Sequence, residues 1–147
     1  MTAVIQNAMI AGGATLTMLA QTHAGKTIAL DTAAGTTITL PASTGGGVKY
    51  RFVVTVVPTS NQHKVQVANA TDVLRGGILN CDTDSSNATL LFPTASTSDT
   101  CTYNGTTQGG FSIGDWIEVE DVKAGFWAIS GVTQANGTVA TPFSAAV

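Results

Sequence analysis

The feature that most constrains the fold is a series of short segments in which apolar and polar side chains alternate. The longest is "VKYRFVVTVV", residues 48–57, and one of its faces carries only apolar side chains: Val48, Tyr50, Phe52, Val54 and Val56. Residues two apart lie on the same face of a strand, so this segment is predicted to be a strand with one face in a core. Its other face begins with Lys49 and Arg51 and then becomes mostly apolar, which indicates burial of both faces toward its end.

Similar segments recur along the chain, with turn-forming residues between them. Residues 27–31 and 37–40 alternate on either side of "TAAG", a pattern typical of a β-hairpin, and "HKVQVANA" alternates through Val65 and Val67. Residues 116–121 and 126–129 flank "VKAG" and predict a closing hairpin whose aromatic side chains supply much of the core. A strand about every 8–12 residues predicts an all-β fold, an antiparallel β-sandwich or small barrel.

The two ends of the chain lack the regular alternation of the segments between them. The β domain is predicted over residues 25–131, an extended N-terminal arm over residues 1–24, and a C-terminal arm over residues 132–147. Residues 3–11 also have helical spacing and stop at a glycine pair, so a short helix stays open as an alternative. The N-terminal segment either orders on binding a partner or packs on its own domain.

Composition excludes several classes of protein. Charged residues make up 10% of the 147, against about 25% in an average domain, and the net charge is −3. The six Lys and Arg residues are scattered, which argues against nucleic acid as a partner. The longest uncharged stretch precedes Lys26 and is interrupted by polar residues, which argues against a membrane span. No basic residue stands ahead of it, so no secretory signal is expected.

The side chains that could carry catalysis form no recognisable pattern. His23 and His63 each stand beside turn residues and are interpreted as surface histidines. Cys81 and Cys101 are expected to be free, buried thiols, although a disulfide across a hairpin stays open. We therefore expect a protein that is not an enzyme and that uses no cofactor.

Two acidic clusters could serve either chemistry or structure. Glu118 and Glu120 are expected to share a solvated strand face, the alternative being the carboxylate pair of a sugar hydrolase. "DTDSSN" places Asp82 and Asp84 like the opening of a calcium loop, but the glycine and the final carboxylate of that loop type are missing. A polar turn is therefore predicted there, and no metal site.

Three stretches of the chain carry a resemblance to a known class of proteins: "GKTIALDTAAGTTITLPASTGGGVKYRFVV", "ANATDVLRGGIL" and "NGTTQGGFSIGDWIEVEDVKAGFWAISG". Together they resemble capsid decoration (cement) proteins of tailed bacteriophages and related head-fibre domains. The shared features are a threonine-rich pair of strands ending in Leu-Pro, a glycine-rich turn, a long valine-rich strand and a terminal Gly-Asp-Trp hairpin. The resemblance covers residues 25–131.

The resemblance implies a structural virion protein on the outer capsid surface, made in the host cytoplasm, that bridges major capsid protein subunits as a homotrimer. The composition fits this role, because strands such as "TIAL" and "TTITL" lack the charges and prolines that protect free sheet edges. The capsid-contact residues expected from the uncharged N-terminal segment are Val4, Ile5, Met9 and Ile10. The alternative is a head- or tail-fibre module that binds a host surface glycan through exposed Tyr and Trp side chains.

Overall fold

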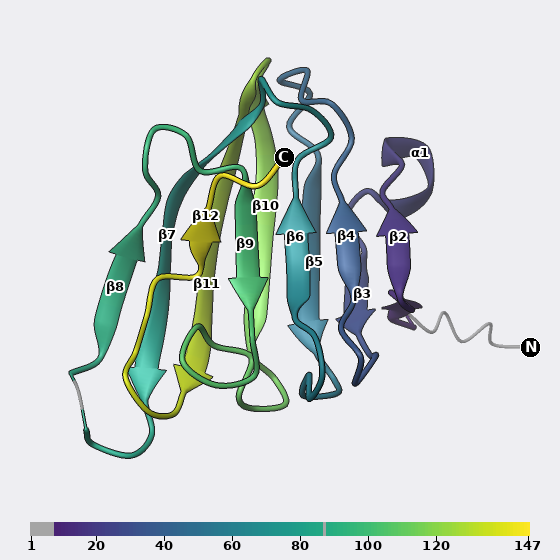
Figure 1. The fold of residues 1–147 in the computed structure, drawn as a ribbon. Coiled ribbons are helices and arrows are strands. Elements are labelled where there is room, and N and C mark those ends of the chain that lie inside the picture. The colour runs from purple at the N-terminus through teal and green to yellow at the C-terminus, as the bar shows by residue number, and fades with distance from the viewer. Residues whose placement is uncertain (1–7, 87) are drawn as a thin grey trace, which may run out of the picture.

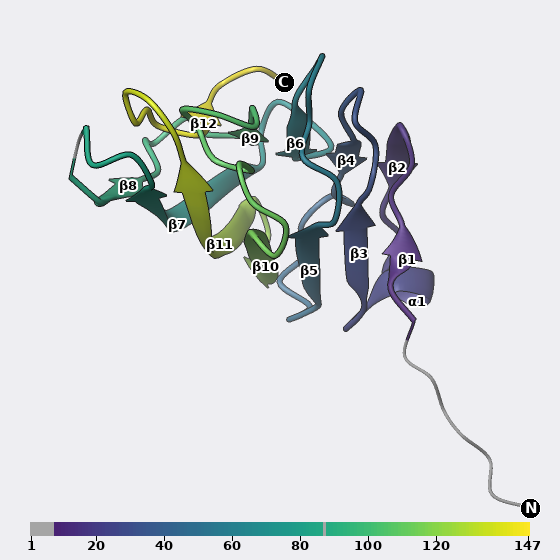
Figure 2. The same ribbon diagram turned by 90° about the horizontal axis from the view of Figure 1, so that it is seen from below.

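Two β-sheets packed face to face make up the protein (Figures 1 and 2). The structure is a computed structural model and describes residues 8–86 and 88–147. The larger sheet has the order β1 (Ile10–Ala11), β3 (Thr27–Leu30), β5 (Lys49–Val54), β10 (Trp116–Lys123), β11 (Phe126–Ala135), β7 (Val73–Asp82) and β8 (Leu90–Pro93). The smaller sheet has the order β12 (Phe143–Ser144), β9 (Thr100–Tyr103), β6 (His63–Gln66), β4 (Thr37–Thr39) and β2 (Thr15–Thr17).

The predicted all-β sandwich is confirmed, with one difference in its pairing. Both sheets mix parallel and antiparallel neighbours, whereas the sequence suggested antiparallel pairing alone. A single short helix, α1 (Ala20–His23), lies among the described residues and sits beside β2. The core lies between the sheets, and its largest fully buried side chains are Trp127, Tyr50, Tyr103, Phe52, Met18 and Ile28.

The chain from β1 to β6 passes from one sheet to the other after every strand. β1, β3 and β5 are parallel neighbours in the large sheet, while β2, β4 and β6 are parallel neighbours in the small sheet. The chain therefore forms a coil, and each turn of this coil contributes one strand to each sheet. Residues 27–40 accordingly do not form the hairpin that the sequence suggested, because β3 and β4 lie in different sheets. Alternation identifies the buried face of a strand but not the strand that pairs with it.

The remainder of the chain is built mostly from antiparallel pairs. β10 and β11 form the predicted closing hairpin, with Asp121 opposite Trp127. Trp127 is fully buried, as expected, whereas Trp116 is only partly buried. β11 also runs parallel to β7 over ten residue pairs, from Phe126 opposite Val73 to Ala135 opposite Asp82. This long parallel pair joins β7 and β8 to the other strands of the large sheet.

The arms predicted at the two ends are shorter in the structure. Residues 1–7 lie outside the described residues, but β1 pairs with β3 from Ile10 onward, and Met18 is fully buried. The residues of the possible helix that the structure describes include Ile10 and Ala11, which form a strand instead. At the other end β11 continues to Ala135, and Phe143 packs into the core from β12. The sandwich thus extends beyond the predicted boundaries at residues 25 and 131, because these short strands complete the sheet edges.

Candidate functional site

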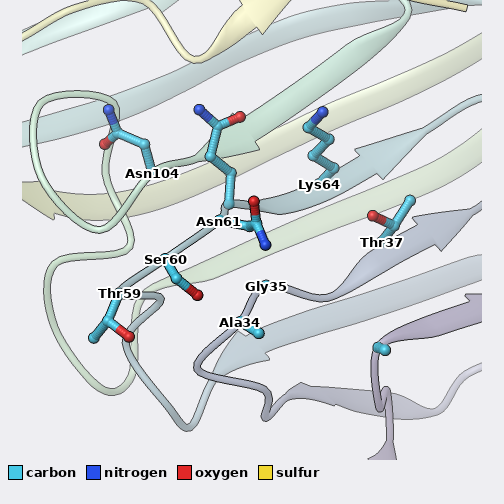
Figure 3. Close-up of a pocket in the computed structure, with 10 residues that line it drawn as sticks. Ala34, Gly35, Thr37, Thr59, Ser60, Asn61, Lys64 and Asn104 are labelled. Carbon is cyan, nitrogen blue, oxygen red and sulfur yellow. The ribbon is translucent and has the colours of Figure 1, made fainter.

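A polar pocket of about 620 Å³ lies where the crossings between the two sheets stack on one another (Figure 3). Ala14 comes from the crossing between β1 and β2, Ala34 and Gly35 come from that between β3 and β4, and residues 59–62 lie in that between β5 and β6. Thr37 of β4 and Lys64 of β6 approach from the small sheet, while Asn104 follows β9. The volume lies within the range of about 300–1,000 Å³ usual for small-molecule sites. Its volume is therefore large enough to hold a small-molecule ligand.

His63 fixes the wall of this pocket from behind. The Thr36 N–H donates to His63 Nδ1 at 3.0 Å, and His63 Nε2 lies 2.7 Å from the Val56 carbonyl oxygen. Because Nδ1 accepts, the proton is on Nε2, which donates to Val56, and the ring is neutral. Burial lowers the pKa of His63, and the Val56 hydrogen bond offsets this only in part. The prediction of surface histidines is wrong for both rings, since His23 is 6% exposed and His63 1% exposed.

Gly35 allows the crossing between β3 and β4 to approach closely the crossing between β5 and β6. Its φ is 91°, and a Cβ there would lie 2.5 Å from the Gln62 carbonyl oxygen. The Thr59 N–H donates to the Ala33 carbonyl at 2.8 Å, and the Lys64 N–H donates to Thr36 at 2.8 Å. The pocket floor is thus a backbone surface held by hydrogen bonds between crossings that are far apart in the sequence.

Some polar side chains at the pocket form hydrogen bonds within the protein, and others do not. The Asn104 amide oxygen accepts from the Thr106 and Gln108 N–H groups, and Thr59 Oγ1 donates to Ala33. Five other lining side chains have no hydrogen-bond or ion-pair partner among the described residues: Thr37, Ser60, Asn61, Gln62 and Lys64. No carboxylate lines the pocket in the described part of the chain. The unoccupied groups therefore provide hydroxyls, amides and one positive charge.

The acidic side chains, in contrast, are all committed elsewhere. Each aspartate of the chain accepts a hydrogen bond from a backbone N–H of a loop or chain end; the seven are Asp31, Asp72, Asp82, Asp84, Asp99, Asp115 and Asp121. The Asp121 carboxylate accepts from the Gly45 N–H at 2.7 Å and from Thr44. Burial opposes ionisation of Asp121, but these hydrogen bonds outweigh it and lower its pKa. The aspartates thus act as loop clamps.

Glu118 and Glu120 share the outer face of β10, as the alternation predicted. Glu118 Oε2 lies 3.6 Å from Arg51 Nη1, and Glu120 Oε2 lies 3.6 Å from Lys49 Nζ. Both carboxylates are about two-fifths exposed, and the two pairs follow the register of β5 against β10. Each glutamate is therefore the acidic partner in one surface ion pair.

The stretch "DTDSSN" forms a turn around its own carboxylates. Asp82 Oδ1 accepts the Asp84 N–H, and Asp84 Oδ1 accepts the Ser86 N–H. Hydrogen bonds from Ser86 and Gly137 lower the pKa of Asp84 to about 2. Over residues 8–86 and 88–147, no group of three or more His, Cys, Asp or Glu could hold a metal ion. Cys81 and Cys101 are free thiols, and Cys101 alone is fully buried.

Two of the four residues expected to contact a capsid, Met9 and Ile10, are described by the structure and lie at the edge of the large sheet. Val4 and Ile5 lie outside the described residues. The Met9 side chain is 52% exposed beside β1, whereas Ile10 is partly buried against the core. Ile10 therefore faces inward, because alternation turns it to the same side as Ile28, its partner in β3.

A row of apolar side chains crosses the outer face of the large sheet. The strand register places one residue of each strand side by side, in the order Ala11, Ala29, Val53, Trp116, Val132, Leu79 and Leu91. We call this set the outer apolar row. Its exposure is greatest at β8, where Leu91 is 67% exposed. The Arg51 guanidinium covers Trp116, 4.4 Å from the ring centroid.

Neither the pocket nor the outer apolar row was found by reasoning from the sequence. Both bring together residues from strands that are distant in the chain, so only the register reveals them. The signal available beforehand was indirect: Lys64 stands in a strand without a nearby acidic residue, and "LLFP" is an apolar run flanked by uncharged loops.

The chain matches no protein-family model, no curated protein and no solved structure. Within the described residues, no helix has the length and apolar character needed to cross a membrane. The resemblance to phage decoration proteins therefore stays a prediction.

Proposed function

We propose that this protein is a structural component of a phage virion that binds the outside of the capsid and stabilises it by bridging major capsid protein subunits. The observation that carries the proposal is the state of the two edges of the large sheet. β1 and β8 are its edge strands and lie at opposite ends of the sandwich (Figures 1 and 2). A protein that bridges two neighbours needs two separate contact surfaces, and these edges provide them.

Both edges lack the charged side chains that isolated sheets use to protect their edge strands. No charged residue occurs among residues 1–25 or 85–98, which include β1 and β8. Met9 and Leu19 are about half exposed near β1, and Leu90 and Leu91 are 41% and 67% exposed in β8. Unpaired backbone groups beside exposed apolar side chains favour pairing with another chain. Pro93 ends β8 and limits that pairing to its first residues.

The outer apolar row connects these two edges across the sheet. Several weak contacts along it would act together, so that their combined avidity exceeds that of any single contact. A homotrimer would multiply the contacts again and belongs to the proposal. The role needs no cofactor, no nucleic acid and no catalysis, and the commitment of all the aspartates to loops supports a protein that is not an enzyme.

The glycan-binding alternative depends on exposed aromatic platforms. Tyr50, Tyr103 and Trp127 are at most 1% exposed, and the Arg51 guanidinium lies over the Trp116 ring. Three of the four Tyr and Trp side chains are thus buried, and a cation covers one face of the fourth. This observation favours the capsid proposal over a fibre module that binds glycan by stacking.

Shells that lack this protein provide the test. The purified protein should bind them in many copies and raise their melting temperature. Leu91→Lys should weaken binding at least about tenfold, because it places a charge in an apolar edge contact. Val122→Lys is the matched control, since Val122 is 50% exposed in β10 but lies on neither edge strand. Absence of binding, or equal loss in both variants, would contradict the proposal.

A further inference from the structure

We propose that the polar pocket at the sheet crossings binds a carboxylate-bearing sugar residue, such as a hexuronate, with Lys64 holding the carboxylate. The proposal does not depend on capsid binding, because the pocket lies at the crossings and not on the edge strands β1 and β8.

Several polar side chains without an internal partner line this pocket together. The charged side chains near the loops are used differently: the aspartates accept hydrogen bonds from backbone N–H groups, and Arg75 donates to the Ala95 and Ser96 carbonyls. At the pocket, five polar side chains have no partner among the described residues: Thr37, Ser60, Asn61, Gln62 and Lys64. They line one hollow from two strands and one crossing, and Figure 3 labels four of them there: Thr37, Ser60, Asn61 and Lys64.

The chemistry of these groups matches a sugar ring. Two hydroxyls and two primary amides both donate and accept hydrogen bonds, as a ring that carries several hydroxyl groups requires. No aromatic side chain lines the pocket in the part of the chain that the structure describes, so an aromatic or strongly apolar ligand would find no stacking surface. A small polyhydroxylated ring fits this lining best.

The charge of Lys64 selects an acidic sugar over a neutral one. Lys64 is the one charged residue that lines the pocket over residues 8–86 and 88–147, and no acidic residue there neutralises it. Lys49 and Arg51, on a strand of the other sheet, instead pair with glutamates. A lysine ammonium with its carboxylate partner missing selects a ligand that brings one. A neutral sugar would leave this charge unused, which is why we assign an acidic one.

The pocket wall is preorganised for a ligand. It is fixed by His63, which bonds to Thr36 and Val56, and by Gly35, which abuts the Gln62 backbone. Ligand binding therefore needs only side-chain ordering, not rearrangement of the crossings. Without aromatic stacking we expect weak binding, with a Kd on the order of 1 mM for a single sugar.

The test is an NMR titration of the full ¹⁵N-labelled chain with three probes: sodium D-glucuronate, D-glucose and sodium acetate. Glucuronate should produce saturable shifts at the amides of Gly35, Gln62 and Lys64. Glucose should bind about tenfold more weakly, since it lacks the charged hydrogen bond. Acetate, which has the carboxylate without the hydroxyls, should not saturate in the same range.

Two matched variants separate this site from general attraction between charges. Lys64→Gln keeps a hydrogen-bond donor but removes the charge, and it should lower glucuronate affinity about tenfold and leave glucose affinity unchanged. Lys26→Gln removes a cation that does not line this pocket and should change neither. The spectrum of each free variant shows whether the fold is intact.

The proposal is overturned by any of four results: no saturable shift with glucuronate, equal affinity for glucose, saturation by acetate alone as tight as that by glucuronate, or equal losses in the two lysine variants. Residue-specific shifts confined to another surface would overturn it as well.

Discussion

The two halves of the sandwich, β1 to β6 and β7 to β12, differ in how their strands are connected and paired. From β1 to β6 the chain coils between the sheets, and strands from successive turns pair in parallel. Ile10 thus lies opposite Ile28, and Ile28 lies opposite Phe52. From β7 onward most neighbours are antiparallel, and β10 and β11 meet directly across a short turn. The coiled half uses strands of two to six residues, whereas β7 and β11 each have ten.

The two halves accordingly obtain their stability from different sources. The long strands β7 and β11 are stabilised by the many backbone hydrogen bonds between them. Short parallel strands need their connections to be fixed, and the coiled half fixes them with His63, Asp31 and close backbone contacts at Gly35. We therefore expect substitutions at the crossings to be costly, although these residues lie outside the strands' hydrophobic faces.

The largest expected effect is that of Gly35→Ala. The new Cβ would lie 2.5 Å from the Gln62 carbonyl oxygen, and the residue would have to keep a φ of 91°. We expect unfolding to become easier by about 3 kcal/mol. Chemical denaturation measures this. Gly13→Ala is the control, because Gly13 also has positive φ but no atom within 4 Å of its Cβ position. Equal losses in the two variants would show that contact between crossings is unimportant.

The next effect concerns His63→Ala. Removal of the ring leaves the buried Thr36 N–H and the Val56 carbonyl without their partner, which should cost about 2 kcal/mol at pH 8. Denaturation at pH 8 measures the loss.

The pH dependence of that effect follows from the lowered pKa of His63. Because the folded state resists protonation, the stability it confers is present above the unfolded pKa of about 6.5 and is lost as pH falls through the lower folded pKa. The gap between wild type and His63→Ala should shrink over that range. His63→Gln, which does not titrate there, should lack this part of the pH dependence. A constant gap from pH 8 to pH 5 would contradict the neutral ring.

Asp121→Asn tests the link between the halves. Asp121 on β10 holds the loop at Thr44 and Gly45, which leads into β5. An amide accepts on one atom only, so we expect a loss of about 1.5 kcal/mol at pH 7. The pKa of Asp121 is lowered, so the stability is present above about 3.9 and is lost as pH falls through the folded pKa. Thermal unfolding of both proteins from pH 7 to pH 2 would show the curves converging; parallel curves would contradict the clamp.

The smallest expected effect is at the surface of the joined sheet. Arg51 and Glu118 lie 3.6 Å apart, with side chains about two-fifths exposed. A double-mutant cycle with Arg51→Gln and Glu118→Gln should give a coupling of about 0.5 kcal/mol, smaller still in high salt. A coupling as large as the loss in Asp121→Asn would mean that surface charge, and not the loop clamps, joins the halves.

Much of the strand pattern could be predicted from residues alone. The alternation in residues 48–57 correctly identified Tyr50, Phe52 and Val54 as core residues. The "VKAG" turn correctly identified the hairpin of β10 and β11. In both cases the signal is local, because two strands joined by a short turn have few alternatives.

The histidines and the pocket escaped prediction for a common reason. His63 stands beside a turn in the sequence, yet its partners Thr36 and Val56 come from other parts of the coil. The free groups at Lys64 and Thr37 become neighbours only through the register of β4 against β6. A polar residue looks the same in sequence whether its partner is water, a distant backbone group or a ligand.

The order of residues was enough to specify a β-sandwich and the buried face of each main strand, because a period of two residues follows from strand geometry alone. Three things became apparent only in the folded chain: which strands are neighbours, which loops the aspartates hold, and which polar groups line the pocket. Burial is a property of each side chain and its spacing, whereas strand pairing depends on backbone hydrogen bonds that every residue except proline can make equally well.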